Sequence, residues 1–171
     1  LSTGASTPSV SANGQYFGSA DKLKRLLRPL DVAGASVTTG TLPYMAMMLR
    51  WAGCADTAPS KCHTVGTSPG GTLPRALFLA QANYVTKPMP AAGRKAAVAA
   101  IERRQGKSSQ GSAALLFDSY GGVVNRVPPG ATAFVHRDAL CCIQYLAYFN
   151  DSSREGTMRR WIDSAWHALQ P

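Results

Sequence analysis

The stretch from residue 111 to residue 149 constrains the fold most, because its hydrophobic pattern has the period of a β-strand. Residues 113 to 118 form two alternating sets: Ala113, Leu115 and Phe117 in one, and Ala114, Leu116 and Asp118 in the other. This alternation predicts a half-buried strand, with the Asp118 carboxylate on the face opposite Phe117. Gly121 and Gly122 follow, and they permit a sharp chain reversal because glycine reaches positive φ without steric cost.

A second strand is predicted from residue 139 to residue 149. One face would carry Leu140, Cys142, Gln144, Leu146 and Tyr148, and the other would carry Cys141, Ile143, Tyr145, Ala147 and Phe149. If the two strands share a sheet in matching phase, Asp118 joins Gln144 and Tyr148 on one surface. Such a polar cluster in an apolar sheet is typical of a ligand pocket. A simpler interpretation also stands: Asp118 satisfies backbone N–H groups in a turn, and Gln144 is an ordinary half-buried polar side chain.

The remaining patterns predict helices around these strands. Strands are expected at 9–17, 112–118, 122–127 and 139–149, an extended segment at 73–87 and a loop at 54–72. Four helices are expected. The first follows Ser19 and has the apolar stripe Leu23, Leu26, Leu27 and Leu30, and the second follows Thr41, with Pro43 in its first turn and Gly53 at its end. The third begins at Pro90 and has the apolar residues Ala97, Val98 and Ile101, and the last is defined by Met158, Trp161, Ile162, Ala165 and Leu169. The predicted fold class is α+β: an antiparallel β-sheet covered on one face by helices, whose other face needs a partner.

Length and hydropathy predict one domain. The chain has 171 residues, of which 45% are hydrophobic, enough for a single core. No apolar run reaches the roughly 18 residues of a membrane helix, and no basic-then-apolar leader opens the sequence. No membrane partner is therefore expected. The chain begins with Leu1 in Ser/Thr-rich sequence, as expected of a processed or clipped polypeptide.

The net charge of +9 raises the question of nucleic-acid binding. The Lys and Arg residues are distributed over three predicted helices and do not form one continuous stripe. No aromatic residues are interleaved with them. Zinc-finger and RNA-recognition signatures are also missing from the sequence. We interpret the cations as solvated helix faces and predict no nucleic-acid partner.

Cys54 and Cys62 lie at the two ends of a short segment rich in Ala, Ser and Pro. This spacing favours a local disulfide, worth roughly 2 to 3 kcal/mol by loop-closure entropy, and hence an oxidising, exported location rather than the cytoplasm. A zinc site at Cys54, Cys62 and His63 is the alternative, but it lacks a fourth ligand. Cys141 and Cys142 point to opposite faces of their strand and are interpreted as small buried side chains.

Two short motifs carry no chemistry in this context. Residues 66–70 match the G-x-S-x-G pattern of serine hydrolases, but the residue after the serine is Pro69, which has no N–H for an oxyanion hole. No glycine-rich phosphate loop is present in the sequence. Asn150, Asp151 and Ser152 fit a glycosylation sequon, which by itself indicates little.

Several of these segments, taken in order, resemble the substrate domain of the berberine-bridge-enzyme-like FAD-linked oxidases. The resemblance runs from about residue 13 to residue 171. Its motifs are Gln15-Tyr16-Phe17-Gly18-Ser19, Trp51-Ala52-Gly53-Cys54, Cys62-His63, Asn83-Tyr84-Val85 with Lys87-Pro88, Phe117-Asp118-Ser119-Tyr120-Gly121-Gly122, Asn125-Arg126-Val127-Pro128, His136-Arg137-Asp138 and Ile143-Gln144-Tyr145. It implies a single substrate-binding domain over 1–171, a fragment without the FAD-binding domain and without the C-terminal tail that contacts flavin.

The resemblance also implies a function. The full-length protein would be an FAD-linked oxidoreductase that oxidises a hydroxyl or C–H of a sugar or natural-product-like small molecule by hydride transfer to flavin. Asp118 would support a tyrosine base absent from this chain. Gln144, Tyr148, Tyr120 and Asn125 would bind substrate, whereas His136 and Arg137 would brace the start of the strand.

The chain's partner would then be the missing FAD-binding portion of its own protein. No metal site and no FAD bound to the isolated chain are expected, and the isolated chain should be inactive. The competing class is a non-catalytic exported module that binds a carbohydrate or a protein on the same open face. A flavin-binding half encoded upstream would distinguish the two classes.

Overall fold

A computed structural model describes residues 10–66, 70–107 and 111–170. By their contacts, the described residues form two compact units, Ala12–Arg75 and a second that begins at Ala76. The assignment of the whole chain to one substrate-binding domain stays a prediction. The Ser68 motif that resembles a serine hydrolase lies outside the described residues, at 67–69.

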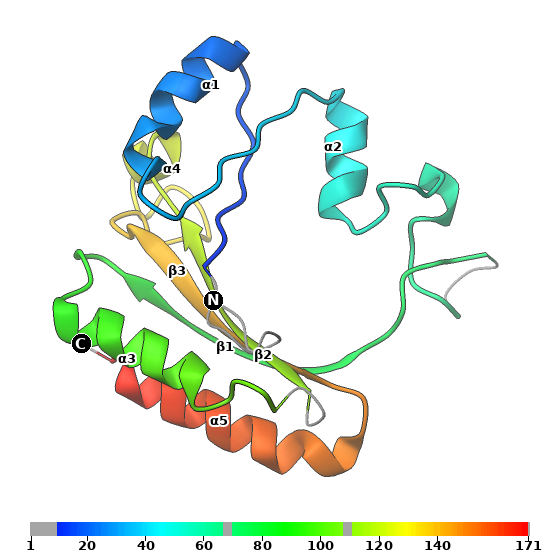
Figure 1. The fold of residues 1–171 in the computed structure, drawn as a ribbon, viewed down its shortest axis with the longest axis vertical. Helices are drawn as coiled ribbons and strands as arrows, with labels where there is room; N and C mark the ends of the chain where they lie inside the picture. Colours follow the sequence, from blue (N-terminus) through cyan, green and yellow to red (C-terminus); the bar gives the residue numbers. More distant parts are fainter. Residues whose placement is uncertain (1–9, 67–69, 108–110, 171) are drawn as a thin grey trace. The chain divides into compact units, whose positions relative to one another are not determined.

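An antiparallel sheet of three strands organises the second unit (Figure 1). Its strands are β1 (Leu77–Val85), β2 (Ser112–Ser119) and β3 (Cys141–Phe149), in the spatial order β1-β3-β2. Leu116 lies opposite Gln144, and Asp118 lies opposite Cys142. The predicted sheet and the phase of its two main strands are therefore confirmed.

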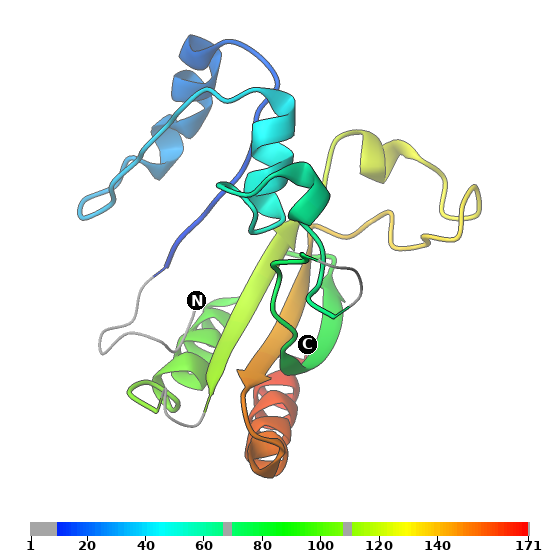
Figure 2. The same cartoon turned by 90° about the vertical axis from the view of Figure 1, so that its right-hand side faces the viewer.

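Helices α3 (Ala91–Glu102) and α5 (Glu155–Ala168) lie side by side against one face of this sheet (Figures 1 and 2). The core between them contains Ala97, Ala100, Ile101, Ala113, Leu115, Ile143, Tyr145, Ala147, Phe149, Met158, Trp161, Ile162, Ala165 and Leu169. The indole Nε1 of Trp161 donates to the backbone carbonyl of Ala100 at 2.9 Å and joins the two helices. The expected apolar stripes of α3 and α5 are confirmed except at Val98, which is 39% exposed. The stripe expected on the first helix is wrong in burial, because Leu26 and Leu30 are exposed.

The other face of the sheet, called the open face here, carries the even-numbered residues of all three strands. These are Phe78, Ala80, Ala82, Tyr84, Ser112, Ala114, Leu116, Asp118, Cys142, Gln144, Leu146 and Tyr148. Phe78 and Tyr148 are exposed on it. The helices of this unit pack on the opposite face, so the prediction of a sheet covered on one side is confirmed.

The segment between β2 and β3 differs from the prediction. Residues 122–127 were expected to form a strand, but Val123–Arg126 form the short helix α4. Gly122 at φ +59 turns the chain out of the sheet direction, and Figure 2 shows this segment projecting beyond the end of the sheet. The Arg137 guanidinium donates to the carbonyl of Val124 at 3.2 Å, which satisfies a helix-end acceptor that no strand neighbour provides. A short 3₁₀ turn, Ser152–Arg154, precedes α5.

The first unit contains α1 (Ala20–Leu27), a 3₁₀ turn at Arg28–Leu30, α2 (Tyr44–Trp51) and a second 3₁₀ turn at Pro59–Lys61. Ser19 caps α1 as predicted, since its side chain accepts from the Lys22 N–H at 3.4 Å. The strand expected at 9–17 is wrong over the described residues 10–17, which have no regular structure. A strand needs a neighbour for its backbone groups, and no strand pairs with these residues in the described part of the chain.

A disulfide joins Cys54 and Cys62, as predicted. Oxidised sulfurs do not ligate zinc, and the described residues contain no group of three potential metal ligands. Cys54 is 1% exposed, and among the described residues of the first unit it is the one buried hydrophobic side chain. The disulfide therefore stabilises a segment that buries little apolar surface of its own. No helix among the described residues is long and apolar enough to cross a membrane.

Candidate functional site

The open face brings the predicted polar residues into neighbouring positions. Tyr84 pairs with Cys142 and Cys142 with Asp118, so these three residues form one row across the sheet. Ala82, Gln144 and Leu116 form the next row. The alternation of side chains along a strand puts both rows on one surface.

Asp118 and Gln144 are in direct contact. The Gln144 Nε2 donates to the Asp118 Oδ2 at 2.5 Å, between diagonally adjacent positions on β2 and β3. Both side chains are half-buried. A hydrogen bond to an ionised carboxylate is stronger than one between neutral groups. The amide therefore orients the carboxylate, and the pair forms a polar point on a largely apolar surface.

Aromatic side chains gather beside this pair. The Tyr84 and His136 rings stack with centroids 3.7 Å apart, and Tyr84 also stacks on Tyr120 at 6.1 Å. Phe134 meets Tyr84, Tyr120 and His136 edge-on. This aromatic cluster, Tyr84, Tyr120, Phe134 and His136, adjoins Asp118 because Tyr84 lies in its row and Tyr120 follows it by two residues.

A second aromatic group lies toward the other end of the open face. Phe78 and Tyr148 are paired positions whose rings stack at 5.7 Å, and they are 58% and 42% exposed. Exposed stacked rings provide a surface for flat or ring-shaped molecules. Tyr148 therefore shares the surface of Gln144, as its strand position indicated.

Asn125 has a different environment from the other predicted substrate residues. Its Nδ2 donates to the backbone carbonyl of Ala139 at 2.9 Å, and it ties α4 to the segment that leads into β3. Its Oδ1 is buried without a hydrogen-bond partner among the described residues. A buried amide oxygen of this kind is costly unless another group satisfies it. The structure thus gives Asn125 a bracing contact, and its role toward substrate stays a prediction.

Burial affects the titration of two groups beside Asp118. Burial raises the pKa of the Cys142 thiol, and the negative charge of Asp118 raises it further. Burial also raises the pKa of the Tyr120 phenol, followed by the influence of Cys142 and Tyr84, a hydrogen bond with Tyr84, and Asp118. Both groups are therefore protonated and uncharged at neutral pH.

Sequence reasoning did not identify Tyr84, Phe78 and Phe134 as members of this surface. Tyr84 and Phe78 belong to β1, and the alternation of side chains along β1 assigns them to one face of that strand. The sequence does not show that β1 pairs with β3, so it could not assign them to the same surface as Gln144. Phe134 lies in the loop between α4 and β3, where no period predicts the direction of a side chain. His136 and Arg137 were expected to brace the start of the strand at 139–149. Arg137 instead donates to Thr132 Oγ1 and to the carbonyl of Val124, which braces the loop before that strand.

The chain is similar to part of larger flavin enzymes. No family model matches it. It is 28% identical over 157 residues to an uncharacterized FAD-linked oxidoreductase, YgaK, of Bacillus subtilis (strain 168), a match that covers 90% of this chain and 30% of that protein.

Solved structures give the same result for the fold. The wild-type BBE-like 1 protein of Physcomitrella patens matches with a TM-score of 0.68 and 25% identity, over 89% of this chain and 32% of that chain. BBE-like #28 of Arabidopsis thaliana matches with a TM-score of 0.63 and 20% identity, over 89% and 31%. The resemblance to berberine-bridge-enzyme-like FAD-linked oxidases is confirmed, and this chain spans about a third of the length of the proteins it matches.

Proposed function

We propose that the chain is the substrate-binding part of an FAD-dependent oxidoreductase and that its open face is a wall of the active site. The hydrogen bond from Gln144 to Asp118 on that face carries the proposal. Its location supports the role, because the pair lies on the side of the sheet that α3 and α5 leave uncovered. The fold shared with berberine-bridge-enzyme-like proteins supports the reaction class.

The residues of the open face suit a substrate better than a dinucleotide. None of its twelve strand positions is Lys or Arg, and most are small or apolar. The diphosphate of FAD is normally bound by cations or by N–H groups at a helix N-terminus. We therefore assign FAD to the remainder of the full-length protein. The open face then fits a substrate held against the ring system, because Ala80 and Ala82 leave room beside the polar pair.

Each polar residue has a distinct part in this proposal. FAD, when bound, supplies the acceptor for a hydride from the substrate. Gln144 holds one carboxylate oxygen of Asp118, and the other accepts a hydrogen bond from a substrate hydroxyl or from a tyrosine supplied by the rest of the protein. Asp118 thereby favours removal of the proton as the hydride leaves. The neutral Tyr120 phenol and the exposed Tyr148 ring orient the substrate on either side.

Anaerobic stopped-flow reduction of the flavin tests the role of Asp118. The full-length protein would be mixed with a panel of sugars and natural-product-like alcohols. Asp118→Asn should slow flavin reduction by about 10²- to 10⁴-fold, the usual contribution of a group that assists proton transfer. Asp163→Asn makes the same chemical change on an exposed position of α5 and should leave the rate unchanged. A wild-type rate in Asp118→Asn would reject the proposed role.

The absorption spectrum of the purified full-length protein distinguishes the enzyme from the competing binding module. Flavin bands that persist after gel filtration support the enzyme, and a flavin-free protein that binds carbohydrate supports the module.

We also propose that the protein is exported, because the Cys54–Cys62 disulfide is stable in an oxidising compartment.

A further inference from the structure

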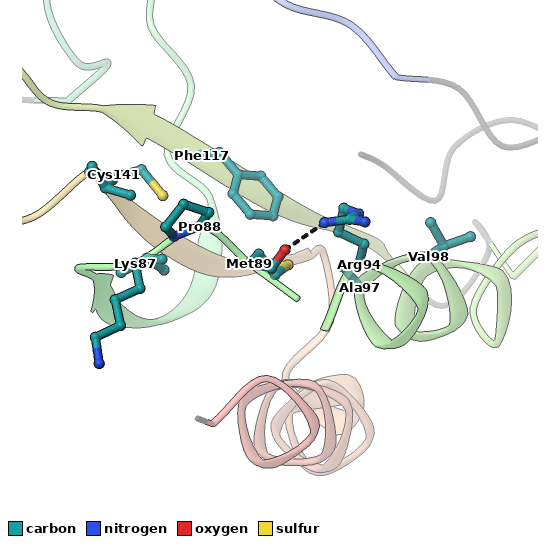
Figure 3. A pocket seen from close by; sticks show the side chains of 10 residues that line it. Lys87, Pro88, Met89, Arg94, Ala97, Val98, Phe117 and Cys141 are labelled. Carbon is teal, nitrogen blue, oxygen red and sulfur yellow. Dashed lines mark hydrogen bonds between the residues drawn. The ribbon is translucent and has the colours of Figure 1, made fainter. Parts of the chain in front are cut away.

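A second candidate site lies on the opposite side of the sheet from the open face. It is a pocket of about 440 Å³ between the end of the sheet, the segment after β1 and α3 (Figure 3). Phe117 and Cys141 reach it from the helix-covered face, whereas their neighbours Asp118 and Cys142 belong to the open face. A molecule in this pocket would therefore not occupy the proposed substrate site.

The pocket wall is apolar and partly uncovered. Phe117 from β2, Val98 from α3 and Leu140 before β3 all line it, although they are 40%, 39% and 43% exposed. Ala97, at 3% exposed, also lines it. Large apolar side chains from three separate segments thus converge on one cavity whose volume lies within the range of about 300 to 1,000 Å³ usual for small-molecule sites. An apolar ligand body is the match for this wall.

One cation is fixed at the pocket. The Arg94 Nη1 donates to the backbone carbonyl of Met89 at 2.6 Å, which fixes the guanidinium among the residues that line the pocket (Figure 3). The stem of Lys87 lines the pocket, but its ammonium extends away from the other labelled side chains (Figure 3). No carboxylate is among the ten lining residues. Most donors of Arg94 are therefore left to bind an anion, and guanidinium geometry suits a carboxylate in particular.

We propose that this pocket binds an amphiphilic carboxylate, with its head group on Arg94 and its apolar chain against Phe117, Val98 and Leu140. Charge and lining together select this class. A purely apolar ligand would make no use of the guanidinium at the pocket, and a fully hydrophilic anion would gain nothing from the wall. The site is independent of the proposed oxidoreductase function, because it lies on the other face of the sheet.

Isothermal titration of the full-length protein with decanoate, below its micelle concentration, tests the proposal. We expect one molecule bound per chain. Arg94→Gln should weaken decanoate binding about 10- to 100-fold, equivalent to about 1.4 to 2.7 kcal/mol, the scale of a lost hydrogen bond to a charged group. Binding of decan-1-ol should not change in this variant. Arg159→Gln alters an exposed arginine of α5 and serves as the matched control.

A second variant separates the cavity from the charge. Val98→Trp adds bulk at the exposed edge of the pocket and should abolish binding of both decanoate and decan-1-ol, and circular dichroism checks that α3 still forms. Failure of decanoate to bind the wild-type protein would overturn the proposal. Equal affinities for the wild type, Arg94→Gln and Val98→Trp would overturn it too, because they would show nonspecific association elsewhere on the surface.

Discussion

Tyr145 is a buried phenol whose environment makes stability depend on pH. Its side chain is 0% exposed and donates to the Asn83 Oδ1 at 3.2 Å. Burial raises the pKa of Tyr145 to about 12. Since the folded pKa lies above the unfolded value of about 10, the folded state holds the proton more tightly. The stability that depends on the protonated Tyr145 phenol is therefore fully present below about pH 10 and is lost as the pH rises toward 12.

This linkage gives a measurable alkaline transition. Between about pH 10 and pH 12 the free energy of unfolding should fall by roughly 2 to 3 kcal/mol on account of Tyr145 alone. Tyr145→Phe should lose about 1 kcal/mol at pH 7 from the missing hydrogen bond, but it should show a shallower alkaline decline. Urea titrations at a series of pH values measure both effects. Tyr44→Phe, at an exposed tyrosine, should reproduce the wild-type slope, and parallel slopes in all three proteins would contradict the assignment.

Gly111 is a position where only glycine fits. Its φ is +103, and an added Cβ would collide with the Met158 side chain and the carbonyl oxygen of Tyr148. The buried Arg104 guanidinium also donates to the Gly111 carbonyl at 3.1 Å. Gly111→Ala should therefore destabilise the protein by more than about 2 kcal/mol, through steric overlap added to an unfavourable φ.

Gly106 provides the matched control for Gly111. It has φ +73, but a Cβ there meets nothing within 4 Å. Gly106→Ala should thus cost only the penalty of a left-handed conformation, about 1 to 2 kcal/mol. Denaturant unfolding of both variants measures the difference. Equal losses would mean that the collision at Gly111 is relieved without cost.

At the same residue scale, the sequence predicted some positions better than others. The sequence could predict that Asp118 and Gln144 share a surface. The alternation of side chains determines which residues share a face within each strand, and only the register between the two strands was left undetermined. The stack of His136 on Tyr84 could not be predicted. Its geometry depends on the path of the loop from α4 to β3, which long-range contacts determine.

At the level of elements, length decided which predictions were correct. Helices α3 and α5 and strands β2 and β3 repeat their apolar pattern several times, so the period is clear. The four residues of α4 contain two β-branched valines, which favour a strand locally. Contacts from distant residues, Arg137 to Val124 and Asn125 to Ala139, override that preference.

The disulfide is the main covalent constraint on the segment after α2. Cys54 and Cys62 enclose a short loop, and a β-bridge between Thr64 and Leu73 follows it. Reduction should remove roughly 2 to 3 kcal/mol of local stability. Hydrogen exchange of residues 54–66 should accelerate on reduction, while β1, β2 and β3 keep their protection. Uniform acceleration throughout the chain would instead indicate that the disulfide stabilises the whole molecule.

The whole molecule concentrates its packing in one unit. Among the described residues, every buried hydrophobic side chain except Cys54 lies between residues 97 and 169. The exposed apolar residues of the first unit include Leu26, Leu30 and Trp51. Burial of apolar surface is the main source of folding free energy. Cooperative unfolding should therefore belong to the sheet and its two helices.

Removal of residues 1–75 tests this distribution. The remaining chain, beginning at Ala76, should keep a cooperative transition with nearly the same midpoint, because it retains all the buried hydrophobic side chains between residues 97 and 169. Fluorescence of the buried Trp161 and far-ultraviolet circular dichroism should then report coincident transitions, since both probes sense the same core. A shortened chain with separate transitions, or with none, would show that the first 75 residues supply packing energy to the sheet. In that case, folding of the second unit would depend on the first.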